Sequence, residues 1–148
     1  MTEALAERWV HDFDSWDVCD QVAALFELTP FARKKIREWA AADQEFVKRA
    51  AFAMMAGLAV HDKTAGDRTF ELFLRAIARA STDRRNFVRK AVNWALRSIG
   101  KRNSRLNRKA IAAAREIGRI DSGAARWIAA DALRELTSPA VQRRLRAR

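Results

Sequence analysis

Two segments of the chain repeat one another at a fixed spacing. The residues FVKRAAFAMMAGL, beginning at Phe46, resemble FVRKAVNWALRSI, which begins 41 residues later at Phe87. A weaker copy, ARWIAADALREL, begins at Ala125. A period near 40 residues with two helices per unit is typical of HEAT and armadillo-like solenoids, because each unit buries its apolar face only against its neighbours. The alternative is an irregular bundle whose helices share composition by chance.

Composition and local signals favour a chain built of helices alone. Gly (5 residues) and Pro (2 residues) are scarce, whereas Ala, Leu, Arg and Lys are abundant. We therefore expect one domain over residues 1–148, an all-α, HEAT/armadillo-like α-α superhelix with a concave basic face. Capping residues and apolar periodicity predict helices beginning near Thr2, Ser15, the Thr29–Pro30 pair, Asp43, Asp67, Ser81 to Asp83, Ser104, Asp121 or Ser122, and the Ser138–Pro139 pair, with Gly100 ending the sixth.

Positive charge is concentrated in the second half of the chain. Residues 1–74 hold 9 Lys and Arg against 13 Asp and Glu, whereas residues 75–148 hold 20 against 5. The formal net charge is +11. This asymmetry indicates a polyanionic partner, and nucleic acid is the obvious one. The alternative is a generally basic surface with no specific partner.

Several classes of protein are disfavoured by the sequence. No apolar run approaches the roughly 18 residues needed to span a bilayer. The start, MTEALAERW, lacks the basic and apolar regions of a signal peptide. A single cysteine, Cys19, excludes a disulfide framework and a cysteine-rich metal site. We expect a protein of a reducing, bacterial-type cytoplasm, with no membrane partner and no bound metal.

Trp94 is predicted to lie outside the core. Along Phe87 to Lys101 the apolar residues form one stripe, and Trp94 projects roughly 130° from its middle at 100° per residue. It shares its face with Lys90, Arg97 and Lys101. An aromatic displayed among cations is costly unless something covers it. A nucleic acid is one cover, and a neighbouring repeat is the alternative.

Three further residues are predicted to point away from the core. Asp20 lies roughly 160° from the stripe formed by Val18, Val22, Leu25 and Phe26, with Trp16 one turn earlier on the same outer face. Arg49 lies roughly 160° from the stripe of its own helix, among small neighbours. The alternatives are that Trp16 packs on the preceding helix, that Asp20 is an ordinary surface acid, and that Arg49 pairs with Glu45.

These residue types together suggest chemistry on a positively charged ligand. A tryptophan face attracts cations and electron-poor bases. A carboxylate between two such faces can balance charge on a ligand or assist the attack of water. An acid inside a basic DNA groove is otherwise hard to explain, because it repels phosphate.

Three motifs resemble the AlkD-like DNA alkylation repair proteins, the HEAT-repeat family of DNA glycosylases. SWDVCD, from Ser15 to Asp20, is similar to the family's W-D-x-x-D segment. FVKRAAF, from Phe46 to Phe52, is similar to its Q-R/K-R-A-A/I segment. DRRNFVRKAVNWALRSIGKRN, from Asp83 to Asn103, is similar to its F-V/I-x-K-A-I-G-W-x-L-R-E segment. The order and spacing of the motifs make the resemblance specific.

The resemblance implies excision of cationic 3-methyl- or 7-methylpurines from double-stranded DNA, without metal or nucleotide cofactor. It implies that Asp20 stabilises the cationic sugar and positions water, with Trp16 and Trp94 flanking it against the deoxyribose and the lesion. It also implies that Arg49 holds backbone phosphate near the site. Further phosphate contacts are expected from Lys90, Arg97, Lys101, Arg84, Arg85 and Arg102.

The sequence departs from the family pattern in two ways. Family members have several more helices before the W-D-x-x-D segment, so we expect a truncated chain, or a compact member that needs a partner. Asn93 stands where the family usually has Gly, and Ser98 stands where Glu is common. The alternative functions are a non-catalytic HEAT-repeat module that recognises branched or distorted DNA, and a protein scaffold with weak, salt-insensitive DNA affinity.

Overall fold

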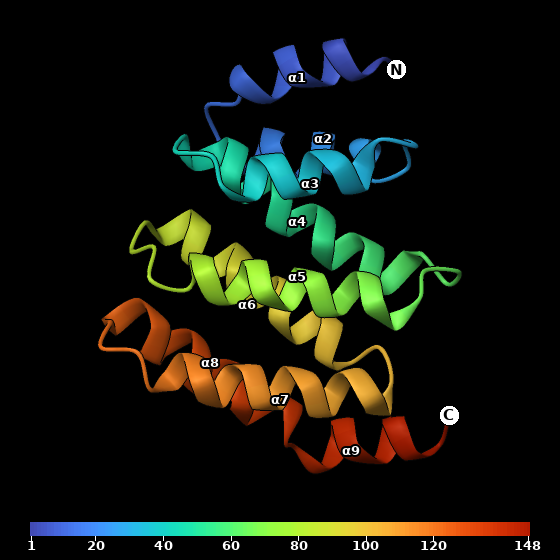
Figure 1. The fold of residues 1–148 in the computed structure, drawn as a ribbon, viewed down its shortest axis with the longest axis vertical. Helices are drawn as coiled ribbons and strands as arrows, with labels where there is room; N and C mark the ends of the chain where they lie inside the picture. Colours follow the sequence, from blue (N-terminus) through green and yellow to red (C-terminus); the bar gives the residue numbers. More distant parts are fainter.

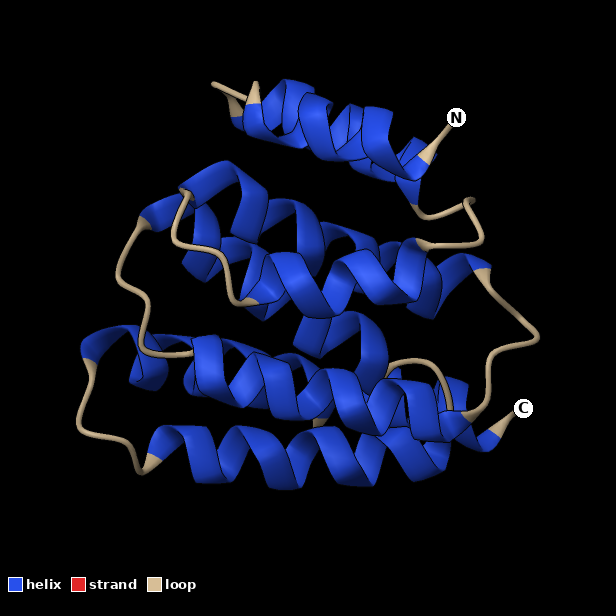
Figure 2. Cartoon of the chain, turned by 45° about the horizontal axis from the view of Figure 1, so that its top comes forward, coloured by secondary structure: helices blue, strands red, loops and turns tan.

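The computed structural model describes residues 1–148 and contains nine α-helices and no strand (Figures 1 and 2). The all-α, HEAT-like prediction is therefore confirmed. No helix is both long enough and apolar enough to cross a bilayer. The helices are α1 (Glu3–His11), α2 (Trp16–Phe26), α3 (Ala32–Ala40), α4 (Glu45–His61), α5 (Asp67–Ala80), α6 (Asn86–Gly100), α7 (Ser104–Gly118), α8 (Gly123–Leu136) and α9 (Pro139–Arg146).

The helices from α2 to α8 form two layers. In one layer α2 packs on α4, α4 on α6, and α6 on α8. In the other layer α5 packs on α7 and only lightly on α3. Figure 1 shows α3, α5 and α7 stacked along the long axis of the molecule, with α6 and α8 behind α5 and α7. Each unit of the repeat therefore gives one helix to each layer, as a helical solenoid requires.

The repeat seen in the sequence is a repeat of buried positions. Val47 and Val88 are both buried, as are Leu58 and Ile99, and the members of each pair are 41 residues apart. Helix α4 contacts α2, α3 and α6. Because neighbours surround it, 11 of its 17 residues are buried rather than a single stripe.

Four predicted helix starts carry the expected side-chain cap. The side chains of Thr2, Ser15, Ser122 and Ser138 each accept a hydrogen bond from a backbone N–H in the first turn of α1, α2, α8 and α9. In α9 a proline follows the cap, as predicted. These caps satisfy donors that would otherwise have no partner.

Three predicted capping residues are wrong. Helix α3 begins at Ala32 rather than at the Thr29–Pro30 pair, and the Thr29 hydroxyl instead donates to the Phe26 carbonyl at 2.6 Å. Helix α4 is preceded by Gln44 rather than Asp43, and α6 by Arg85 rather than by Ser81, Thr82 or Asp83. None of these three helices has a side-chain cap, so no capping residue marks where they begin.

Candidate functional site

Helix α2 does not bury the face that its apolar residues predict. Cys19, Ala23 and Phe26 are buried, whereas Val18 and Leu25 are 44% and 54% exposed. The buried face is therefore turned by roughly 80° from the predicted stripe. Small side chains on this face let α2 lie against α4. As a result, the next residue after Cys19 lies at the edge of the interface between α2 and α4 rather than opposite it.

That residue, Asp20, forms a two-pronged ion pair with Arg49 of α4. The Nε of Arg49 donates to Oδ1 of Asp20 at 2.9 Å, and its Nη2 donates to Oδ2 at 2.8 Å. Such a fork holds the plane of the carboxylate in one orientation. The side chain of Asp20 is 24% exposed, so its remaining lone pairs have access to a ligand or to water.

Arg49 also reaches the third helix of its layer. Its Nη1 donates to the carbonyl of Phe87 in α6 at 2.7 Å, and its guanidinium lies 6.0 Å from the Phe87 ring centroid. Arg49 is only 8% exposed. The prediction that it points into open surroundings is wrong, because α2 and α6 pack on either side of α4. The pairing with Glu45 does not occur, since Arg49 bonds Asp20 instead.

The thiol of Cys19 lies beside this pair but is unsuited to catalysis. Its Sγ donates to the Phe46 carbonyl at 3.3 Å. Burial and, to a smaller extent, the negative charge of Asp20 raise the pKa of Cys19 to about 12, against the opposing effect of Arg49. Because only a thiolate is nucleophilic or binds metal well, Cys19 is a packing residue. No cluster of three or more His, Cys, Asp or Glu residues is placed to hold a metal ion.

Two exposed tryptophans lie on the helices that flank α4. Trp16 in the first turn of α2 is 49% exposed, and Trp94 in α6 is 37% exposed. The prediction that Trp94 lies outside the core is confirmed. Asp20 thus belongs to a layer that displays one large aromatic surface on each side of α4.

The cations around Trp94 are partly neutralised by α8. Lys101 lies 3.0 Å from Glu135, and Arg97 lies 3.5 Å from Glu135 and 3.7 Å from Asp131. Lys90 is exposed and makes no ion pair. Asp131 and Glu135 were not predicted to lie on this face, although both stand in ARWIAADALREL, the weaker copy of the repeat.

The three remaining arginines of the predicted DNA-binding set have different surroundings. Arg102 donates to the carbonyls of Ala59 and Ala65 at 3.0 and 2.8 Å and lies 4.4 Å from the ring centroid of Phe70. Arg85 is bound to Asp83 and to a backbone carbonyl. Only Arg84 is exposed without a partner.

Burial opposes ionisation of Asp83, but the hydrogen bonds from Arg85 and Lys48 outweigh it and hold the pKa of Asp83 well below its usual range. The hydrogen bonds that Arg85 donates to Asp83 in turn raise the pKa of Arg85. Arg85 is therefore a fixed cation at the start of α6 rather than a freely moving one.

Sequence reasoning missed a second aromatic and cationic contact in this layer. The guanidinium of Arg89 lies 4.4 Å from the ring centroid of Trp127 in α8, and Trp127 is 36% exposed. Asn93, where the sequence departs from the family pattern, is buried and donates to Asp131 at 2.6 Å. Trp127 stands in the ARWIAADALREL segment, and projecting that helix at 100° per residue, as was done for Trp94, could have identified it as an exposed aromatic residue.

Comparison with a solved structure shows the same fold. The structure is described as "A new family of proteins related to the HEAT-like repeat DNA glycosylases with affinity for branched DNA structures". It superposes with a TM-score of 0.69 and 19% sequence identity, covering 91% of this chain. The chain spans 63% of the length of that protein.

Comparison of the sequence with known proteins shows the family. No curated protein matches the sequence. A family model described as "DNA alkylation repair enzyme" matches residues 1–136. Because this match takes in α1 to α8, with both tryptophans and the Asp20–Arg49 pair, the chain belongs to the DNA alkylation repair enzyme family.

Proposed function

We propose that the protein is a monofunctional DNA glycosylase that releases cationic alkylated purines of the 3-methyladenine and 7-methylguanine type. The observation that carries this proposal is the carboxylate of Asp20, held at both oxygens by Arg49 and open to solvent on its remaining side. An exposed tryptophan lies on each helix that flanks the pair.

The proposed reaction breaks the bond between C1′ of the deoxyribose and the ring nitrogen of the purine. The bonding electron pair leaves with the purine and cancels the positive charge of its alkylated ring. Positive charge develops on the sugar, where the carboxylate of Asp20 stabilises it. A water molecule supplies the oxygen that bonds to C1′, and Asp20 accepts a hydrogen bond from this water, whose proton passes to solvent.

The other residues of the site position the reacting groups. Arg49 fixes the orientation of Asp20 and acts as a positioning residue, in place of the phosphate contact expected from the sequence. The faces of Trp16 and Trp94 suit contact with a cationic base and with the sugar. Lys90 and Arg84 are exposed and unpaired, so they are the members of the predicted cationic set best placed to contact phosphate.

Base release from methylated DNA tests the proposal. DNA treated with a methylating agent is incubated with the protein, and free 7-methylguanine and 3-methyladenine are measured by mass spectrometry. We expect release by the wild type and a loss of about a hundredfold or more in Asp20→Asn. Asp121→Asn, at a fully exposed acid, is the matched control and should be unchanged. DNA binding without base release by the wild type would refute the proposal.

A second candidate function is a non-catalytic module that recognises branched DNA. It is favoured by the occupation of both Asp20 oxygens by Arg49, which is also how a purely structural pair would look, and by the affinity for branched DNA stated for the structural neighbour. It predicts tighter binding to a four-way junction than to the same length of duplex, unaltered by Asp20→Asn. Base release separates the two functions, because only the glycosylase has a release activity for Asp20→Asn to abolish.

A further inference from the structure

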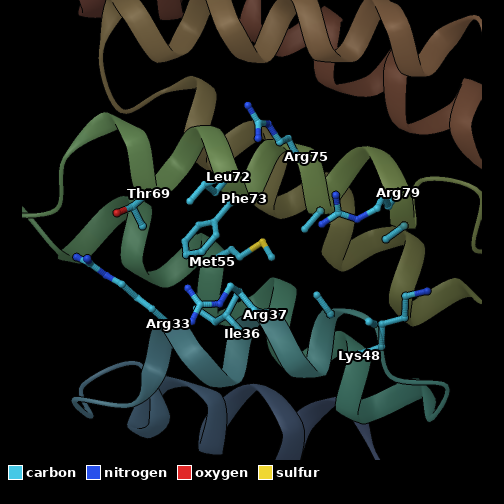
Figure 3. A pocket seen from close by; sticks show the side chains of 14 residues that line it. Arg33, Ile36, Arg37, Lys48, Met55, Thr69, Leu72, Phe73, Arg75 and Arg79 are labelled. Carbon is cyan, nitrogen blue, oxygen red and sulfur yellow. The ribbon is translucent and has the colours of Figure 1, made fainter.

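A groove opens between α3 and α5, on the layer opposite α2 and α6. Its volume is about 600 Å³ (Figure 3). Because α3 and α5 touch only lightly, the groove extends down to α4, whose fully buried Met55 is among the lining residues. Neither Asp20 nor either tryptophan of the proposed site lines the groove, so nothing that follows depends on the proposed function.

The floor of the groove is apolar and aliphatic. Its accessible part comes from α5, where Leu72 is 38% exposed and Ala76 is half-buried, whereas Ile36 of α3 and Met55 of α4 also line it but are fully buried. The one aromatic residue of the lining, Phe73, is only 4% exposed and offers no open face for a base to stack on. The groove therefore offers no exposed aromatic ring on which the bases of a single-stranded nucleic acid could stack.

The banks of the groove are cationic, and no acidic residue lines it. Arg37 projects from α3, and Arg75 and Arg79 project from α5; all three are exposed and make no ion pair or hydrogen bond. Arg33 and Lys48 also line the groove, although each faces an acid outside the lining. Figure 3 shows these side chains distributed along both banks rather than gathered at one end.

The groove is long enough to hold several turns of a helix. The lining residues of α5 run from Thr69 to Ala80, which at 1.5 Å per residue is about 16 Å, or three helical turns. An apolar floor between two cationic banks over this length matches a helix with an apolar stripe and acids on both sides of the stripe. A DNA duplex presents phosphates but no apolar stripe, and it would leave the floor uncovered.

We propose that the groove between α3 and α5 is a docking site for an acidic amphipathic helix of a partner protein. The apolar stripe of that helix covers the aliphatic floor, with anchors spaced at i, i+3, i+4 and i+7. Its Asp and Glu side chains pair with Arg37, Arg75 and Arg79, which supply orientation and a fast approach as well as affinity.

Selection from a library of helical peptides tests this proposal on the full chain. Peptides displayed with randomised positions over four turns are selected on the wild type and counter-selected on Arg37→Glu/Arg75→Glu. We expect the enriched peptides to carry an apolar stripe flanked by Asp or Glu. Enrichment of peptides that lack either feature, or no enrichment over the counter-selected variant, would overturn the proposal.

Binding of the best enriched peptide is then measured by fluorescence anisotropy. We expect the double charge reversal to weaken binding by about tenfold or more. Arg143→Glu/Arg144→Glu, at two exposed and unpaired arginines of α9, changes the net charge equally and should leave binding unchanged. Ala76→Phe, which fills the groove without changing charge, should weaken binding too, and circular dichroism shows whether each variant is folded.

Competition with DNA completes the test. An unlabelled duplex that displaces the peptide from the wild type at matched ionic strength would show a general polyanion surface and refute the proposal. Peptide binding unaffected by the duplex supports it. Equal loss in the α9 control would also refute it, because the effect would then follow net charge rather than the groove.

Discussion

Arg49→Met is the substitution that most directly tests whether Asp20 is held in place. It leaves a carboxylate that is 24% exposed without its partner, in a site where the guanidinium was 8% exposed. Breaking a buried ion pair by removing one partner costs about 3–5 kcal/mol, and the partial exposure of Asp20 places the loss near 3 kcal/mol. The lost hydrogen bond to the Phe87 carbonyl adds about 1 kcal/mol. We expect the free energy of unfolding to fall by about 3–4 kcal/mol.

A double-mutant cycle isolates the pair itself. Asp20→Asn keeps the shape and one acceptor but leaves the buried guanidinium of Arg49 without a counter-charge, so alone it should cost about 3 kcal/mol. Because Asp20→Asn/Arg49→Met leaves no unpaired charge, we expect its loss to be about 2 kcal/mol smaller than the sum of the single losses. The free energies are measured by urea unfolding followed by circular dichroism. Additivity within about 0.5 kcal/mol would refute the coupling.

The conservative variant separates positioning from stability. Lys at position 49 keeps the charge but cannot reach both oxygens of Asp20 and the Phe87 carbonyl together, since it is a single point donor. In the proposed glycosylase, Arg49→Lys should therefore lower the single-turnover rate of base release while DNA affinity stays unchanged. A fully folded variant with an unchanged rate would show that the orientation of Asp20 does not matter.

Three further perturbations probe the fold and the charge of the site. The pKa of Asp83 is lower in the folded than in the unfolded protein, so its ionised form stabilises the fold above the unfolded pKa, and this stabilisation is lost as pH falls below about 4. Asp83→Asn should therefore make the free energy of unfolding less dependent on pH in this acid range. An unchanged pH dependence would contradict this. Gly100→Ala should lower the melting temperature, since an added Cβ would lie 2.6 Å from the buried side chain of Leu136, whereas Gly123→Ala, with open space around it, should not. Glu135→Gln should tighten DNA binding and steepen its salt dependence, because it removes the charge that now pairs with Arg97 and Lys101. Binding is measured by titration at several salt concentrations, and unchanged affinity would mean that these two cations do not contact phosphate.

The helical fold could be predicted from the sequence because its signals are periodic. Residues 41 apart share burial in α4 and α6, and that spacing is visible without any structure. Helix boundaries were predicted where a capping side chain marks them, as at Ser122, and missed where the cap is Phe31 or Gln44, whose side chains make no capping bond. The stripe of α2 was misplaced because a count of apolar residues favours exposed Val18 over buried Cys19.

The site could be predicted only as far as a single helix describes it. The exposure of Trp94 follows from the periodicity of α6 alone. The burial of Arg49 does not, because it results from two other helices packing on either side of α4, and an angular projection treats each helix as though only one face were covered. For the same reason, the pairing of Arg97 with Asp131 could not be read from α6, whose sequence contains no partner for it.

The paired cations at the C-terminal end of α6 change what the basic half of the chain means for catalysis. A surface that only binds DNA gains from every free cation, since each releases counterions from the backbone. A surface that must stabilise a cationic sugar is harmed by unpaired cations near the sugar, because like charges raise the energy of that state. Arg97 and Lys101 face Glu135, and Arg49 is matched by Asp20, so the layer with the two tryptophans is less positive than its sequence indicates. In the proposed glycosylase, Glu135→Gln should therefore strengthen DNA binding while slowing base release, whereas in a pure DNA-binding module it should only strengthen binding.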